Sequence, residues 1–317
     1  MNKNHKKVYS GIGGQAVIEG IMMKNKSEYA VAVRKSNGEI VVKKDTYLMM
    51  QEKYKILGLP FIRGIFSMVD SLILGSKTLE YSASFFDDEE MVEESKLDKW
   101  LNEHLSGKTL SIVMGIVTAI SVVLALFIFA LVPAAIGSFC KSTFNIESHF
   151  VTAFIEGIAR IILFILYIKL ISRMEEIRRT FEYHGSEHKC INCIENGWDL
   201  TVDNVMKASK EHKRCGTSFL VYVMIISIFL FMFINPPTLL LKFVSRIILI
   251  PVVAGVSYEI LRLMGKFDNK FVDIISRPGM WMQGLTTHEP DRSEVEVAIK
   301  AVEAVFDWKK FKEANFK

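Results

Sequence analysis

The chain has 317 residues, of which 50% are hydrophobic, and a formal net charge of +4 at pH 7. The apolar residues are gathered into long runs, which is unusual for a soluble domain and typical of membrane helices, because a bilayer span needs about 20 of them. The basic residues are dispersed and are not interleaved with aromatic residues, which argues against a nucleic-acid-binding protein. No apolar segment of a secretory signal follows the basic N-terminus.

The first predicted element is a small antiparallel sheet over residues 12–50. Its strand-like runs are rich in β-branched residues, and the pair Asn37-Gly38 separates two of them. Asn-Gly between two such runs is a strong hairpin signal, because both residues tolerate positive φ. One carboxylate, Glu19, lies in the first run. We assign residues 1–53 to a cytoplasmic N-terminal β domain.

The second predicted segment, residues 54–108, combines an apolar helix with an acidic connector. Arg63, Asp70 and Lys77 interrupt its apolar sequence at seven-residue spacing. That spacing places the three charges on nearly one face of a helix. We therefore favour an interfacial or re-entrant helix over a full span.

Four apolar stretches predict a transmembrane bundle within residues 109–264. The expected spans are about 109–132, 151–171, 217–235 and 239–262. Glu156 and Arg160 stand four residues apart in the second span and can pair with each other. An ion or substrate path that also uses Lys242, Arg246 and Glu259 is the functional alternative to such structural pairs.

The distribution of Lys and Arg predicts the orientation, because cytoplasmic flanks carry more of them. Residues 1–108 contain sixteen, residues 172–215 contain eight and the tail after Met264 contains nine, whereas the connector 133–149 contains one. We expect a multi-pass protein of the inner or plasma membrane with both termini in the cytoplasm. The loop 172–216 would face the same side.

The last predicted segment is cytoplasmic and covers residues 265–317. Within it, residues 279–290 predict a strand-like or extended piece. Asp291 and Glu294 then have the spacing of a capping box and predict the start of a helix. The whole chain is thus predicted to be an α+β membrane protein. It combines a four-span helix bundle, the interfacial or re-entrant helix and a small cytoplasmic antiparallel β/α domain.

The loop 172–216 carries the densest chemistry in the chain. Three of the seven histidines and three of the four cysteines lie within 32 residues, namely His184, His188, His212, Cys190, Cys193 and Cys215. Cytoplasmic thiols stay free or bind metal rather than form structural disulfides. Imidazoles and thiolates at this density favour zinc or another divalent transition metal.

Two arrangements of such a metal site are open. His184, Glu187 and His188 form a His-x-x-Glu-His string, the inverted zinc-protease pattern in which two histidines bind zinc and the glutamate activates water. His212 or Cys215 would supply the third ligand. The alternative is a closed structural site, in which Cys190-x-x-Cys193 and His212-x-x-Cys215 provide four ligands and no chemistry.

Four separated strings resemble one family. They begin at Gly13 (Gly-Gly-Gln-Ala-Val-Ile-Glu-Gly), Glu182 (Glu-Tyr-His-Gly-Ser-Glu-His-Lys), Arg214 (Arg-Cys-Gly-Thr-Ser-Phe) and Leu285 (Leu-Thr-Thr-x-Glu-Pro-Asp). Together they resemble the bacterial YqhQ-like membrane protein family, a domain of unknown function labelled as metal-dependent. The family strings map onto Gln15, Glu19, His184, Glu187, His188, His212, Cys215, Thr286 and Thr287. Cys190 and Cys193 lie outside the strings, which shifts weight away from the closed site.

The resemblance implies that these distant strings meet in one cytoplasmic domain, where Glu19 would approach the metal. We therefore predict His184, His188, His212 and Cys215 as metal ligands. Glu187 and Glu19 are the predicted catalytic residues. The favoured function is a metal-dependent hydrolase of unknown substrate, with a non-catalytic metal-stabilised scaffold or assembly factor as the alternative and a small transporter less favoured. The expected partners are the lipid bilayer and a membrane-associated substrate or protein, with no nucleic acid.

Overall fold

The computed structural model describes residues 7–86, 107–234, 236, 238–267 and 269–316. The chain divides into two compact units, which we describe separately. Unit 1 comprises residues 1–86, 168–223 and 250–317, and unit 2 comprises residues 87–167 and 224–249. The acidic connector predicted within the second segment, residues 87–98, lies outside the described residues.

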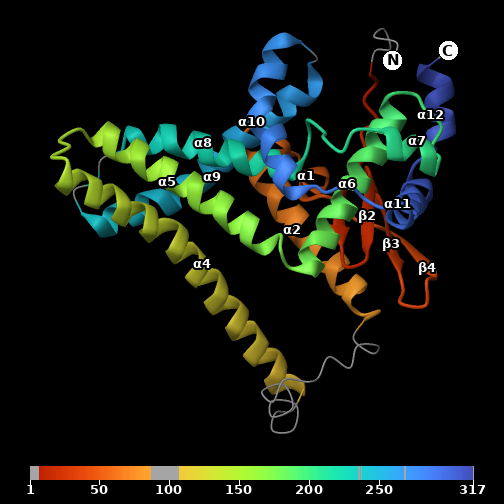
Figure 1. Ribbon diagram of the computed structural model, residues 1–317, viewed down its shortest axis with the longest axis horizontal. Coiled ribbons are helices and arrows are strands. Elements are labelled where there is room, and N and C mark those ends of the chain that lie inside the picture. The colour runs from red at the N-terminus through yellow and green to blue at the C-terminus, as the bar shows by residue number, and fades with distance from the viewer. Residues whose placement is uncertain (1–6, 87–106, 235, 237, 268, 317) are drawn as a thin grey trace. The chain divides into compact units, whose positions relative to one another are not determined.

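Unit 1 contains a four-stranded antiparallel sheet in the order β1-β2-β3-β4 (Figure 1). The strands are β1 Gly13–Val17, β2 Gly20–Asn25, β3 Glu28–Arg34 and β4 Ile40–Thr46. Gly38 has a φ of +86° between β3 and β4, as the Asn-Gly pair predicts. The first strand-like run folds as two strands, with Ile18 and Glu19 as the turn between them, and Glu19 has a φ of 47°. The predicted small sheet is therefore confirmed, with one more hairpin than expected.

Both faces of this sheet are covered, because its strands place apolar side chains on both sides. Ile21, Met23, Ala30 and Ala32 point to a core that they share with helices α6 (Glu175–Glu195) and α11 (Arg292–Val305). The alternate residues, such as Met22 and Val31, meet Leu74 of helix α2 (Ile62–Ala83) on the opposite face. The result is a helix–sheet–helix arrangement within unit 1.

The charges that mark α2 in the sequence all have partners within unit 1. Arg63 pairs with Glu259, Asp70 accepts hydrogen bonds from Tyr47 Oη at 2.9 Å and from the N–H of Met50 at 2.9 Å, and Lys77 pairs with Asp45 at 3.3 Å. This pairing, together with the packing of Leu74 on the sheet, gives the helix a role in the fold of unit 1.

The remaining elements of unit 1 are short, apart from α10. They are α1 Met50–Lys53, the 3₁₀ helix η1 Lys55–Gly58, α7 Val202–Lys207, α10 Lys270–Thr286 and α12 Trp308–Asn315. The extended piece predicted over residues 279–290 is helical as far as Thr286, because buried residues recur at helical spacing through α10. The capping box of Asp291 and Glu294 at the start of α11 is present as predicted.

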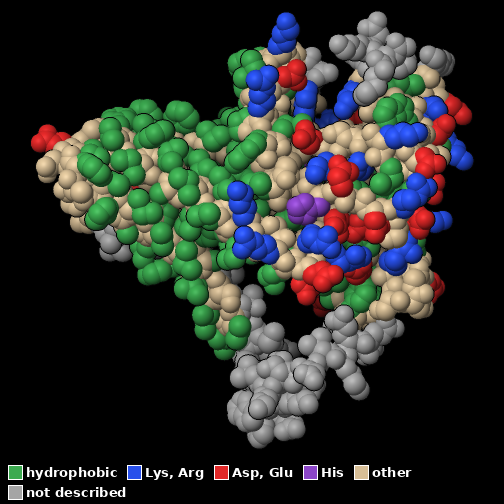
Figure 2. Space-filling model, viewed as in Figure 1, with side chains coloured by type: hydrophobic (Ala, Val, Ile, Leu, Met, Phe, Trp, Pro, Cys, Tyr) green, Lys and Arg blue, Asp and Glu red, His purple; other side chains and the backbone are tan. Residues whose placement is uncertain are grey.

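Four long apolar helices make up or enter unit 2: α4 Gly107–Thr143, α5 His149–Ile171, α8 Gly216–Met232 and α9 Leu239–Lys266. Three stretches in the described residues are long and apolar enough to cross a membrane, Val123–Thr143, His149–Ile171 and Val244–Gly265. The helix α8 is apolar but shorter. Figure 2 shows apolar side chains gathered over the helices of unit 2 and charged ones gathered over unit 1. This is consistent with a membrane protein, in which a lipid-facing helix exposes apolar residues.

Candidate functional site

The helix α6 presents two histidines from one face. His184 and His188 are four residues apart, so their rings lie one turn from each other and meet edge to face, with centroids 4.4 Å apart. Gly185 lies between them although glycine weakens a helix. A Cβ at that position would collide with the backbone carbonyl oxygen of His288. The glycine therefore lets the segment after α10 pass directly against α6.

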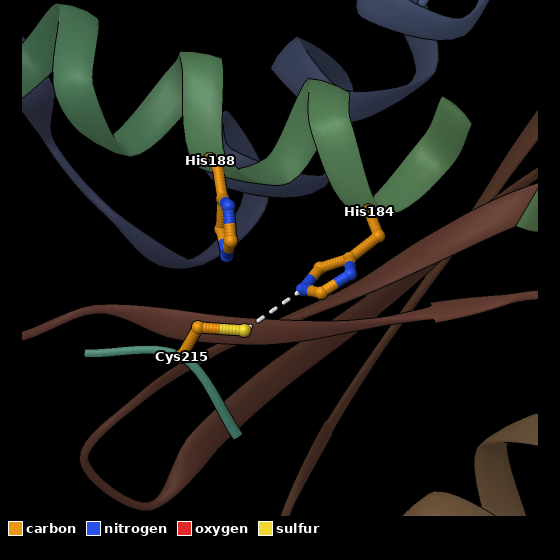
Figure 3. A group of neighbouring side chains, drawn as sticks. All are labelled: His184, His188 and Cys215. Carbon is orange, nitrogen blue, oxygen red and sulfur yellow. Dashed lines mark hydrogen bonds between the residues drawn. The ribbon is translucent and has the colours of Figure 1, made fainter. Parts of the chain in front are cut away.

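Cys215 completes a group of three potential metal ligands. It lies immediately before α8 and is 5% exposed, and one ligand atom from each of His184, His188 and Cys215 falls within 4.8 Å of the other two. The His184 Nε2 and Cys215 Sγ atoms are 3.1 Å apart. Figure 3 shows both imidazoles projecting from α6 toward the cysteine.

Backbone carbonyls fix the orientation of both imidazoles. His184 Nδ1 lies 3.0 Å from the carbonyl oxygen of Thr286, and His188 Nδ1 lies 2.6 Å from that of Lys210. A carbonyl oxygen only accepts hydrogen bonds, so each Nδ1 carries the proton. Each ring would offer its Nε2 lone pair to a metal once the Nε2 proton is lost, and the Nε2 of His184 faces Cys215 Sγ. Metal-binding histidines in general show this arrangement.

The electrostatics of the group favour a thiolate at Cys215. Burial raises the pKa of this thiol, but His184 and His188 oppose burial and hold the pKa well below its usual value. Burial lowers the pKa of His184, and the nearby Cys215 more than offsets this, raising the pKa to about 9. The side chain most suited to bind a soft metal is therefore stabilised in the form that binds.

Glu187 is buried beside this group. The backbone N–H of Gly14, in β1, donates to its carboxylate, and a Cβ at Gly14 would press on that carboxyl group. Burial raises the pKa of Glu187, while His184 and His188 lower it. The three mutually close ligand atoms do not include Glu187. Its catalytic role stays a prediction.

His212 lies next to the group and has its own partners. Its ring centroid is 5.7 Å from that of His188, and its Nε2 lies 3.4 Å from a carboxylate oxygen of Glu195. Glu195 also accepts from Arg214 at 2.7 Å. Burial lowers the pKa of His212, and Glu195 opposes that shift. The ligand role of His212 stays a prediction.

Glu19 is tied to a different set of side chains. Arg179 binds both carboxylate oxygens of Glu19, and the hydroxyl of Tyr183 donates to one of them at 3.4 Å. Tyr183 directly precedes His184 in α6. Through these contacts Glu19 links the β1–β2 turn to the helix that carries the histidines. Its catalytic role stays a prediction.

Cys190 and Cys193 lie in an apolar environment. Both side chains are fully buried in the core between the sheet, α6 and α11, among residues such as Ile191 and Ile194. Burial raises the pKa of both thiols, that of Cys193 to about 12. A neutral thiol in a hydrophobic core is a poor ligand. In the part of the chain that the structure describes, the candidate metal group leaves this pair out.

Sequence reasoning missed two residues that shape the group. Gln283 clamps the backbone of His212, since its Oε1 accepts from the His212 N–H at 2.9 Å and its Nε2 donates to the carbonyl at 2.6 Å. Thr217 donates its backbone N–H toward Cys215 Sγ at 3.4 Å. The sequence signal for Gln283 was a polar residue on the buried face of α10. The sequence signal for Thr217 was its position within the third family string.

Fold and site together define an α+β protein that carries candidate membrane-spanning helices and a largely buried His/His/Cys group. The chain belongs to the family described as "Protein of unknown function (DUF1385)", whose model matches residues 59–308. It is 33% identical over 322 residues to "Uncharacterized protein YqhQ" of Bacillus subtilis (strain 168), an alignment that covers 98% of this chain and 97% of the relative. No solved structure matches the chain significantly. The predicted YqhQ-like family is thus confirmed.

Proposed function

We propose that this protein is a membrane-bound metal-dependent hydrolase whose metal is held by His184, His188 and Cys215. The observation that carries the proposal is the orientation of the two imidazoles. Each Nδ1 is engaged by a backbone carbonyl, at 3.0 Å and 2.6 Å, which leaves both Nε2 atoms for a shared ion. Three protein ligands with one position left for water is the pattern of catalytic rather than structural zinc.

The donor set fits zinc or another divalent transition metal. Two neutral imidazoles and one thiolate are soft to intermediate ligands, whereas calcium and magnesium prefer oxygen. When bound in such a site, the metal supplies Lewis acidity and makes water a better nucleophile at neutral pH.

Within this proposal, Glu187 transfers the proton. Its carboxyl is enclosed, is held by the Gly14 N–H and has a pKa raised by burial, which suits a group that accepts a proton from water and passes it to a leaving group. Thr286 and Lys210 hold the histidines through their carbonyls. The substrate class follows only from the candidate spans of the chain: an ester, amide or phosphoester presented at the membrane, in a lipid or a membrane protein.

A variant of Glu187 tests this assignment. Purified full-length protein in nanodiscs would be assayed for release of product from short-chain esters, phosphoesters and a membrane lipid extract, with metal content measured in parallel. We expect Glu187→Gln to keep one metal per chain and to lose at least about a hundredfold in rate, as is typical for removal of an acid–base group. Unchanged turnover in Glu187→Gln would contradict the catalytic role.

The proximity of His212 favours a second candidate function. With its ring centroid 5.7 Å from that of His188, a rotation of His212 away from Glu195 would bring a fourth ligand to the ion. A four-ligand site is closed and structural. The protein would then be a metal-stabilised scaffold or assembly factor. In that case His212→Ala would weaken metal binding as much as His188→Ala, and Glu187→Gln would have no effect.

A further inference from the structure

A cluster of charges in unit 2 has no part in the proposed chemistry. Glu156, in α5, is 1% exposed, and its two carboxylate oxygens are bound by Lys242 and Arg246 of α9. Gly137 of α4 packs directly against Glu156, because a Cβ at this glycine would collide with the Glu156 side chain. Each carboxylate oxygen of Glu156 is therefore already paired with a cation.

A third cation lies beside this ion pair. Arg160 stands one helical turn after Glu156, and its Nε donates to the carbonyl oxygen of Phe129 at 3.3 Å. The guanidinium groups of Arg160 and Arg246 both approach the ring of Phe231, at 5.8 Å and 5.2 Å from its centroid. The sequence suggests that Glu156 and Arg160 pair within one helix. Instead, Glu156 pairs with two residues of α9, and Arg160 donates to a carbonyl of α4.

The charges of this cluster do not balance. Lys242, Arg246 and Arg160 face one carboxylate, and the sequence of residues 107–167 and 224–249 offers only one other acid, Glu147, which is exposed. Excess positive charge within apolar helices is costly unless something neutralises it. Glu259, which the sequence grouped with these residues, pairs with Arg63 in unit 1.

We propose that Arg160, Arg246 and Lys242 form a binding site for a phosphate-type oxyanion. Guanidinium groups match the oxygens of phosphate, and Lys242 adds a point charge. A small cavity of about 10 Å³ lies beside the ion pair. It is lined by Lys242, Arg246, His149 and Phe231 among others, and Arg160 approaches the same Phe231 ring from outside this lining. That space suits one oxygen of a larger group, with the rest of the anion outside it.

The anion has two sources with the same chemistry, the headgroup of an anionic phospholipid and free phosphate. Delipidated full-length protein in detergent would be titrated with dihexanoyl phosphatidylglycerol and, separately, with inorganic phosphate, and binding would be followed by native mass spectrometry and thermal shift. Saturable binding of either ligand that depends on Arg160 supports the site. The ligand that binds more tightly identifies the source.

Two substitutions with opposite expected signs make the test specific. Arg160→Gln removes a cation and should weaken binding about tenfold, within the range expected for a lost charged hydrogen bond. Glu156→Gln removes the competing carboxylate and should strengthen binding several-fold. Lys169→Gln, on the same helix but exposed and outside the cluster, is the matched control and should change nothing.

Either of two results would overturn the proposal. Binding of neither ligand to the unmodified protein, or binding that Arg160→Gln leaves unchanged, would mean that the cluster is only a structural ion pair. If Glu156→Gln fails to fold, Arg160→Gln and Arg160→Lys still decide the matter. Lysine keeps the charge and should retain most of the affinity that glutamine loses.

Discussion

Units 1 and 2 each bury ionisable side chains, but they satisfy them differently. Around His184 and His188 in unit 1, each ring has a fixed backbone partner on Nδ1, and the Nε2 of His184 faces the sulfur of Cys215. In unit 2 the carboxylate of Glu156 is saturated by two cations while Arg160 adds a further charge. The first arrangement presents electron-pair donors to a cation, and the second presents cations to an anion. The two clusters therefore point to ligands of opposite charge.

The largest expected effect tests the electron-pair donors of unit 1. Cys215→Ala or His188→Ala should lower metal content from one ion per chain to near zero, since two ligands bind a metal far more weakly than three. Plasma emission spectrometry on dialysed protein measures this. Cys140→Ser changes a free cysteine of unit 2 and should retain the metal. Equal metal loss in Cys140→Ser would show that loss reflects handling and not ligation.

The close approach of the segment after α10 to α6 gives the next prediction. Gly185→Ala places a methyl group against the His288 carbonyl, which should displace the neighbouring Thr286 carbonyl from His184. We expect about 1–3 kcal/mol of destabilisation, as for other overpacked sites, and weaker metal binding. Gly216→Ala is the matched control, because a Cβ there meets nothing within 4 Å. Thermal unfolding with and without metal should separate the two variants, and similar behaviour would contradict the packing argument.

The clamp formed by Gln283 predicts a smaller effect. Gln283→Leu leaves the buried N–H and carbonyl of His212 without these partners, which should cost about 1–3 kcal/mol. Because the clamp holds the backbone between Lys210 and Cys215, metal affinity should fall by about tenfold, the lower end for loss of a supporting contact. Competition with a chelator measures the affinity. Loss of stability with unchanged affinity would show that the clamp does not position the ligands.

The smallest expected effect concerns pH. Glu294, 1% exposed at the start of α11, has its pKa raised by burial to about 8 from a reference value of 4.5. The folded protein therefore binds this proton more tightly than the unfolded chain, so Glu294 contributes less stability as pH rises from 4.5 to 8. Glu294→Gln should stabilise the protein by about 1–2 kcal/mol at pH 8 and have little effect at pH 4.5. Thermal unfolding at both pH values gives the test, and a pH-independent change would contradict it.

Local patterns in the sequence predicted much of unit 1. The Asn37-Gly38 hairpin and the capping box at Asp291 are decided by the conformational preferences of a few adjacent residues, and both are present. The resemblance of separated strings implied that distant segments meet, and unit 1 contains all of them. The helical spacing of His184 and His188 was also readable, because α6 continues through Gly185.

The remaining features depend on tertiary contacts that no local pattern encodes. Residues 279–286 are helical because one face of α10 is buried, although their composition resembles an extended segment. Whether Cys215 or His212 joins the two histidines depends on how the chain between Lys210 and Cys215 is held, and Gln283 from a distant helix holds it. Four spans were predicted from hydropathy, whereas three stretches of the described chain are long enough, because α8 is short.

The coordination sphere of the metal tests the central claim most directly. X-ray absorption spectroscopy on the purified, metal-loaded protein, repeated on His212→Ala, would count nitrogen and sulfur ligands. We predict one sulfur and two imidazole nitrogens per ion, with a light oxygen ligand in the fourth position and no change on loss of His212. A site with no bound sulfur, or one that loses a nitrogen in His212→Ala, would contradict the open His184, His188 and Cys215 centre.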